Sequence, residues 1–246
     1  MFIINRSSAV GYDLKQAFTY VWSDADFFTK WAIGSFLLVF PTFSTCFPGI
    51  KRAFQNPANY GWMLVFAVVS VVIYLAVKGY FYKAVHNNVV HDAEKLPDWH
   101  KFWTYMHNGL KAYVGMAIFA LPYALVAGGF CYLFRPNFHN PLVYAVGMLV
   151  MILFFAIYLP FSLNFATRLR VKAFFSYKRA FWLLKGKYKE YFALYGYCVA
   201  IGLGGFILSG LLSMHGMTSL LLPFLGFYVV MVFADLYAQF LNMPAK

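Results

Sequence analysis

Charged residues are scarce in this sequence, and acidic residues are the scarcest. Of 246 residues, 11% are charged, against roughly a quarter in an ordinary soluble domain. Only 8 are Asp or Glu, against 20 Lys or Arg, which gives a formal charge of +12, while 62% of the residues are hydrophobic and 22% aromatic. This composition excludes a nucleic-acid-binding protein as the explanation of the positive charge and predicts a membrane protein.

Cysteine is also rare, and its spacing excludes a metal or redox motif. The three cysteines, Cys46, Cys131 and Cys198, occur in no metal-like or C-x-x-C pattern. We expect them to be buried as small apolar side chains. A disulfide between Cys46 and Cys131 near the outer face of the membrane is the alternative.

The residue sets of membrane-embedded enzymes are missing as well. The sequence contains no Asp-rich metal motif, no Lys/Arg/His set of a lipid phosphatase, no paired glutamates of a prenyl-type protease and no Gly-x-Ser-Gly. The histidines between residues 86 and 107 lack the four-residue spacing that puts two metal ligands on one helical face. We therefore expect no enzyme, no metal and no cofactor, haem included.

Long uncharged runs are what the sequence has instead. About 20 helical residues cross a hydrocarbon layer of about 30 Å. The run from Tyr191 to Ala234 is about twice that length and is interrupted by polar residues near Ser213, so it predicts a helical hairpin. The predicted fold class is all-α, a polytopic integral membrane protein forming one domain over residues 1–246, with six spans at about 31–50, 60–77, 112–134, 141–167, 191–212 and 218–241.

Lys and Arg lie almost entirely on one side of these predicted spans. The side that carries both termini holds 17 of the 20, and the other side holds 3. Because loops rich in Lys and Arg stay in the cytoplasm, we expect a multi-pass protein of the bacterial cytoplasmic (inner) membrane with both termini cytoplasmic. Residues 1–28 carry three aspartates and no apolar core, so the first span is expected to act as the insertion signal.

Three stretches that precede the odd-numbered spans have apolar residues at helical spacing, which is typical of a helix lying in the membrane interface. Aligning Trp22, Trp103 and Trp182 gives a period of about 80 residues. The pattern predicts three cytoplasmic-side amphipathic interfacial helices and a possible threefold repeat. The aromatic and basic composition of any membrane interface is the alternative explanation. The implied repeat units are 13–90, 98–170 and 176–243.

Ionisable and polar residues within the apolar runs are functional candidates, because a charge at mid-bilayer costs about 2.5–3.5 kcal/mol on insertion scales. Asp235 is expected to pair with Arg168 or Arg170, and the alternative is a bound cation. Asn164 is expected to hydrogen-bond a neighbouring helix, and the alternative is a polar cavity beneath a kink at Pro160.

Two further groups are candidates for contacts with lipids or with other helices. A basic cluster between the fourth and fifth spans could bind lipid phosphates, or could only follow the topology rule; it comprises Arg168, Arg170, Lys172, Lys178 and Arg179. Small residues on the fifth span, four residues apart, would let another backbone approach closely; they are Gly196, Ala200 and Gly204 on one line and Gly205 and Ser209 on another.

Four short motifs carry a resemblance to a known family. They are Lys78-Gly79-Tyr80, Glu94-Lys95-Leu96-Pro97-Asp98-Trp99, Asn108-Gly109-Leu110-Lys111 and Leu121-Pro122. Residues from about 10 to 200 resemble an uncharacterised prokaryotic family of polytopic membrane proteins that is known as a domain of unknown function. The organisation is distantly similar to the membrane domain of some glycerophosphodiester phosphodiesterases, without their catalytic domain. The resemblance implies a fold and no activity.

Two functions are compatible with these observations. The first is a non-catalytic integral membrane accessory or scaffold subunit, whose partners are membrane lipids and other integral membrane subunits. The alternative is a transporter or lipid-handling protein for an apolar or amphipathic substrate, with a cavity among helices broken at the prolines at positions 41, 122, 160 and 223.

Overall fold

A computed structural model describes residues 11–46, 60–90, 96–134, 141–213 and 221–244, and all regular structure in these ranges is helical. Each predicted span corresponds to a long helix. These helices are α2 (Phe27–Cys46), α4 (Tyr60–Val90), α5 (Phe102–Phe134), α6 (Pro141–Arg168), α8 (Tyr188–Ser213) and α9 (Leu222–Asn242). Short helical turns precede or connect them: α1 (Leu14–Thr19) and η1 (Tyr20–Ser23) precede α2, and η3 (Trp99–Lys101), η4 (Val171–Ala173) and α7 (Tyr177–Trp182) lie between long helices.

Within the described ranges, four helical stretches are long and apolar enough to cross a membrane: Tyr60–Val90, Trp99–Val126, Tyr188–Leu212 and Leu222–Asn242. The apolar stretches Phe27–Val39 in α2 and Ile152–Arg168 in α6 are shorter. By the length and composition of its helices, the chain is an all-helical membrane protein.

The helices differ from the predicted spans mainly at their ends. Helix α4 continues to Val90, well past the predicted end at residue 77, and α5 begins at Phe102 instead of residue 112. The second predicted interfacial helix is therefore not a separate element, because η3 leads directly into α5. Charged residues mark where an apolar run ends, but Lys and His are compatible with a continuing helix, so they do not end it.

The prolines do not divide the helices as the cavity alternative requires. Pro122 lies inside α5 and Pro160 inside α6, and both helices continue through them. Pro223 stands in the first turn of α9, where its missing N–H has no intrahelical partner to lose. The side chains of Cys46 and Cys131 lie outside the described residues, and Cys198 is a free thiol.

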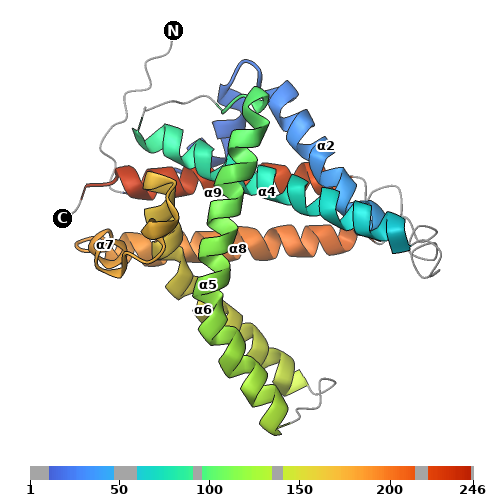
Figure 1. Ribbon diagram of the computed structural model, residues 1–246. Coiled ribbons are helices and arrows are strands. Elements are labelled where there is room, and N and C mark those ends of the chain that lie inside the picture. Colours follow the sequence, from blue (N-terminus) through green and yellow to red (C-terminus); the bar gives the residue numbers. More distant parts are fainter. Residues whose placement is uncertain (1–10, 47–59, 91–95, 135–140, 214–220, 245–246) are drawn as a thin grey trace.

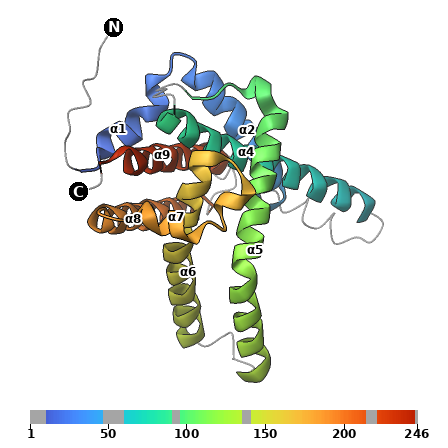
Figure 2. The same ribbon diagram turned by 60° about the vertical axis from the view of Figure 1, so that its left-hand side comes forward.

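The long helices form three hairpins, α2–α4, α5–α6 and α8–α9. They are joined where α4 ends and α5 begins and where α6 ends and α8 begins. The start of α2 contacts the first of these connections through Lys30, and we call these helix ends the charged end. In both views α5 and α6 extend together away from the other hairpins (Figures 1 and 2). The α5–α6 hairpin is thus an arm that projects from a base in which α9 packs against α2, α4 and α8.

Helices α4 and α5 cross at two glycines from the motifs described above. A Cβ on Gly79 would lie 1.7 Å from the backbone oxygen of Tyr105, and a Cβ on Gly109 would lie 1.8 Å from the backbone oxygen of Leu75. Both distances are far below van der Waals contact, so any larger residue would separate the two backbones. The crossing fixes the α5–α6 arm on the base.

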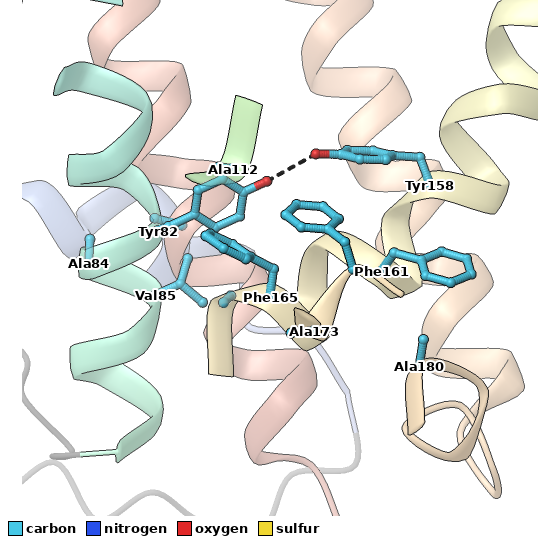
Figure 3. Close-up of a cluster of buried hydrophobic side chains, with 12 residues drawn as sticks. Tyr82, Ala84, Val85, Ala112, Tyr158, Phe161, Phe165, Ala173 and Ala180 are labelled. Atoms are coloured by element: carbon cyan, nitrogen blue, oxygen red, sulfur yellow. Dashed lines mark hydrogen bonds between the residues drawn. The ribbon is translucent and has the colours of Figure 1, made fainter. Parts of the chain in front are cut away.

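Buried side chains are concentrated near the charged end. One cluster joins α4, α6 and the η4–α7 connection around Tyr82, Phe165 and Phe174. In it the Tyr82 hydroxyl lies 3.2 Å from the Tyr158 hydroxyl (Figure 3). The Tyr82 hydroxyl also lies 2.8 Å from Ser162 Oγ. Two more clusters pack α9 against its neighbours, one around Leu163 and Leu236 and one around Tyr80 and Phe227.

The other halves of several helices bury few side chains within this chain. Many large apolar residues there are 43–76% exposed. They include Leu64 and Val68 on α4, Leu125 and Val126 on α5, Leu149 and Leu153 on α6, and Phe206 and Ile207 on α8. In a membrane protein, surface of this kind faces lipid or the helices of another protein.

Candidate functional site

A buried ion network at the charged end is the most strongly polar site in the described part of the chain. It consists of Asp24, Lys30 and Asp98 with the backbone of Leu96, and we call it the Lys30 junction. The Lys30 ammonium donates to Asp24 Oδ2 at 2.8 Å and to the Leu96 carbonyl at 2.9 Å, and it lies 2.9 Å from Asp98 Oδ1. The Lys30 and Asp24 side chains are 9% and 2% exposed, so the pair is largely removed from water.

Local backbone geometry positions the two partners that come from the N-terminal segment. Asp24 follows η1 in an extended conformation, and its Oδ1 accepts a hydrogen bond from the Asp26 backbone at 2.9 Å. Helix α2 starts at Phe27, which brings Lys30 back over the Asp24 carboxylate. Asp24 Oδ2 also accepts from the Leu96 backbone N–H at 2.8 Å, and this bond ties the N-terminal segment to the α4–α5 connection.

Aromatic residues hold the Leu96-Pro97-Asp98-Trp99 segment in place. The Trp99 indole donates to the Lys30 carbonyl at 2.9 Å and stacks on Tyr80, with ring centroids 4.2 Å apart and planes 10° apart. The Tyr80 hydroxyl donates to the Pro97 carbonyl at 2.8 Å, and Tyr105 donates to the Asp98 carbonyl. The segment is thereby bonded to α2, α4 and α5 together.

The protonation states follow from these contacts. Burial raises the pKa of Asp24, but its bonds with the Lys30 ammonium and with two backbone N–H groups lower it by more, so the pKa lies below its ordinary value. Burial lowers the pKa of Lys30, and its bonds with Asp24 and Asp98 raise it by more. Both groups are therefore charged around neutral pH, as a structural ion pair requires.

The junction lies between two shallow surface pockets. One, of about 280 Å³, is lined by Asp26, Thr29, Lys30, Ile33, Asp98, Trp99 and His100. The other, of about 200 Å³, is lined by residues of α4 and α5 together with Leu96, Pro97 and Asp98. Among the described residues, no three His, Cys, Asp or Glu side chains come close enough together to hold a metal ion.

The ion pair expected of Asp235 is not formed. Asp235 is 3% exposed, and its Oδ2 accepts from Gln239 Nε2 at 2.7 Å, one turn further along α9. Arg168 and Arg170 are both exposed, and neither pairs with Asp235 in the described structure. Gln239 also exchanges hydrogen bonds with the Asp13 backbone, so the polar end of α9 is bonded to the start of α1 instead.

Asn164 is fully buried. Its side-chain amide forms a hydrogen bond with the η4 turn instead of with a neighbouring long helix. Its Nδ2 donates to the Ala173 carbonyl at 2.7 Å, which attaches η4 to α6. Neither surface pocket above includes Asn164 or Pro160.

The basic cluster is brought together on one connection. All five side chains, Arg168, Arg170, Lys172, Lys178 and Arg179, are exposed on the segment from the end of α6 to α7. By contrast Lys187, which follows α7, is buried and donates to the Phe240 carbonyl. The structure thus separates basic residues that bond within the chain from basic residues that remain on its surface.

The two lines of small residues on α8 have different surroundings. Around Gly196 and Gly204, no atom of a neighbouring element lies within 4 Å of the place that a Cβ would occupy, and Ala200 between them is exposed. On the second line, a Cβ placed on Gly205 would lie 3.9 Å from Cγ2 of Val229 on α9. The Ser209 hydroxyl donates to the Phe206 carbonyl within α8. The first line packs against no element in the described part of the chain, so its contact with another helix stays a prediction.

The central part of the chain matches a known protein family. Residues 62–214 match the family described as Protein of unknown function (DUF4013). The chain belongs to this family. No curated protein and no solved structure matches it.

The DUF4013 match runs from α4 through α8. It includes the glycine crossing, the Leu96-Pro97-Asp98-Trp99 segment, Asn164 and the basic cluster. Asp24, Lys30 and Asp235 lie outside the matched residues. The DUF4013 region therefore supplies one side of the Lys30 junction, and the preceding N-terminal segment supplies the other.

The sequence did not predict the Lys30 junction. Asp24 and Asp98 are 74 positions apart, and no motif spacing connects them. The available signal was that Asp98 lies in the Leu-Pro-Asp-Trp motif and that Asp24 and Lys30 directly precede an apolar run. This pattern also fits a solvated loop, and only the packing of the start of α2 against the Leu96-Pro97-Asp98-Trp99 segment distinguishes the two.

Proposed function

We propose that this DUF4013 protein is a non-catalytic accessory or scaffold subunit, which packs against other integral membrane proteins and lipids. The observation that carries the proposal is the uncovered first line of small residues on α8. Gly196, Ala200 and Gly204 recur every four residues and therefore lie along one side of the helix. Within the described ranges, no atom of a neighbouring element lies within 4 Å of a Cβ placed on Gly196 or Gly204.

Such a surface favours a protein neighbour over lipid alone. Where small residues line a helix, a second backbone can approach closely, and the resulting van der Waals contact is a main source of helix association in a bilayer. Large apolar residues flank the line, including Leu203 at 57% and Ile207 at 62% exposed. They would extend the contact surface on either side of the close approach.

The base of the structure suits a scaffold because it is rigidly built. The glycine crossing and the Lys30 junction connect α2, α4 and α5 at the charged end, while the outer halves of the helices stay uncovered. A fixed base with open arms holds the partner surfaces in a constant relative orientation. This preorganisation reduces the entropy lost when a partner helix docks.

Several features of the arrangement belong to the same proposal. We infer six spans, with both termini in the cytoplasm of a bacterial cell and the charged end at the cytoplasmic face of the inner membrane. The threefold repeat is supported by the similar exposure of its aligned tryptophans, Trp22, Trp103 and Trp182, at 57%, 73% and 66%. The likeness to the membrane domain of glycerophosphodiester phosphodiesterases remains a prediction.

The test compares two glycines on different sides of α8. Gly204→Leu fills the uncovered line, whereas Gly202→Leu adds the same side chain about 160° around the helix, where it also meets no atom within 4 Å. Each variant is extracted gently from its own membrane, and native mass spectrometry records the bound proteins and their stoichiometry. We expect a stoichiometric membrane partner with the wild type and with Gly202→Leu, and loss of that partner with Gly204→Leu.

Two results would contradict the scaffold role. One is a wild-type chain that is purified without any protein partner. The other is a purified chain that by itself moves a substrate across reconstituted vesicles, which would support the transporter alternative.

A further inference from the structure

The connection between α6 and α8 has two sides of different character. Its inner side is buried, with Ala173, Phe174 and Ala180 each 2% exposed or less. Asn164 holds the segment to α6 through the Ala173 carbonyl, and α6 ends at Arg168, directly before Leu169, whose φ of 51° is rare for a residue with a side chain. The connection is therefore a built surface fixed to the base, and we call residues 168–182 the basic segment.

The outer side of the basic segment carries a concentration of positive charge. Its five Arg and Lys side chains are exposed, and none makes an ion pair with another described residue. No Asp or Glu occurs between residues 168 and 189. The two buried lysines show the contrast, because Lys30 is paired with aspartates and Lys187 bonds a backbone carbonyl.

Aromatic side chains share this outer side. Phe175, Tyr177, Phe181 and Trp182 are 46%, 60%, 52% and 66% exposed. Tyr and Trp are enriched where a membrane meets water, since an apolar ring and a polar atom can each find their own medium there. A surface made of cations and interfacial aromatics complements a phosphate layer directly above a hydrocarbon layer.

We propose that the basic segment binds the phosphate headgroups of anionic phospholipids. Arg168, Arg170, Lys172, Lys178 and Arg179 contact the phosphates, and the four aromatic rings lie at the level of the headgroups and upper acyl chains. The site is separate from the uncovered line on α8. Lipid binding at this site and partner binding at α8 can therefore be tested independently.

The first experiment measures lipid affinity by native mass spectrometry of the full chain in detergent. Phosphatidylglycerol and phosphatidylcholine are titrated separately. Removing two of the five charges in Lys172→Gln/Lys178→Gln is expected to weaken phosphatidylglycerol binding by about 10- to 30-fold, since each Lys near a headgroup layer contributes about fivefold. The matched control is Lys15→Gln/Lys101→Gln, which removes two exposed lysines from other segments and should leave the affinity within about twofold.

The second experiment locates the lipid by fluorescence. The protein is reconstituted in phosphatidylcholine bilayers that contain either brominated phosphatidylglycerol or brominated phosphatidylcholine at the same mole fraction. We expect stronger tryptophan quenching by the brominated phosphatidylglycerol. Trp182→Phe should remove most of this excess quenching. Trp22→Phe, which changes a ring on η1 that is 57% exposed against 66% for Trp182, should preserve it.

The proposal would be overturned by equal affinity for the two lipids. It would also be overturned if both double variants lost phosphatidylglycerol to the same extent, because the charge would then act through the whole protein. Competition by inorganic phosphate at concentrations that leave the bilayer intact would assign the site to a soluble anion and not to lipid.

Discussion

Replacing Gly79 by alanine tests whether the α4–α5 crossing fixes the base of the fold. The added Cβ would lie 1.7 Å from the Tyr105 oxygen, 2.6 Å from the Tyr105 carbonyl carbon and 2.7 Å from the Gly109 nitrogen. All three neighbours are backbone atoms, so no side-chain rotation relieves the overlap. A carbon and a carbonyl oxygen require about 3.3 Å, and the helices would have to separate by about 1.5 Å.

The size of the effect follows from two opposing contributions. Alanine favours a helix over glycine by about 0.8–1 kcal/mol. Overpacking in a tightly packed site typically costs about 1–3 kcal/mol and occasionally more, and here the overlap involves rigid backbone, which puts the cost at the upper end. The shift would also disturb the adjacent Tyr80–Trp99 stack. We expect a net loss of about 2 kcal/mol, which corresponds to a fall in Tm of about 4–8 °C for a chain of this size.

The assay is thermal unfolding in detergent, followed by intrinsic tryptophan fluorescence. Gly204→Ala is the matched control, because it makes the same substitution within a helix where no atom lies within 4 Å of the new Cβ. That control should unfold at the wild-type temperature or slightly above it. If Gly79→Ala and Gly204→Ala unfold within about 1 °C of each other, the close crossing is not a determinant of stability and the reasoning fails.

Two further predictions concern buried polar groups. Because the pKa of Asp24 is lowered on folding, its contribution to stability is present above its unfolded pKa of about 3.9 and is lost as the pH falls through the lower folded value. Asp24→Asn leaves the Lys30 ammonium buried with a weakened partner, so it should lower the free energy of unfolding by about 3 kcal/mol at pH 7. It should also flatten the loss of stability between pH 5 and 3. A variant with the wild-type profile of Tm against pH would contradict the role of the junction. Asn164→Leu should lower the free energy of unfolding by about 1 kcal/mol, because the hydrogen bond to the Ala173 carbonyl is lost, and should speed amide hydrogen exchange over residues 171–182. If mass spectrometry shows the same exchange rate there as in the wild type, the bond does not hold the segment.

Helix positions were predictable from this sequence, and helix ends were not. Uncharged runs indicated where six long helices lie, because a bilayer excludes charge and irregular backbone from its interior. The continuation of α4 to Val90 was missed, because Lys78 and Lys83 end the apolar run without ending the helix. The same reasoning misassigned the stretch after Trp99 as a separate interfacial helix.

The polar contacts depended on which segments meet. Asp235 was expected to pair with Arg168 or Arg170 because all three lie near the same ends of their helices. In the structure it bonds Gln239 on its own helix, and the arginines remain exposed. Matching the depth of two residues in a membrane does not determine which sides of their helices face each other.

The sequence by itself determined the class of the protein, its helical content and the approximate position of each long helix, since these follow from hydrophobicity along the chain. Only the tertiary structure decided that Gly79 and Gly109 form a crossing while Gly196 and Gly204 face no other described element, and that Lys30 is buried while Lys172 is exposed. The physical reason is that lipid tails are as apolar as leucine, so hydrophobicity does not distinguish a helix side that contacts protein from one that contacts lipid.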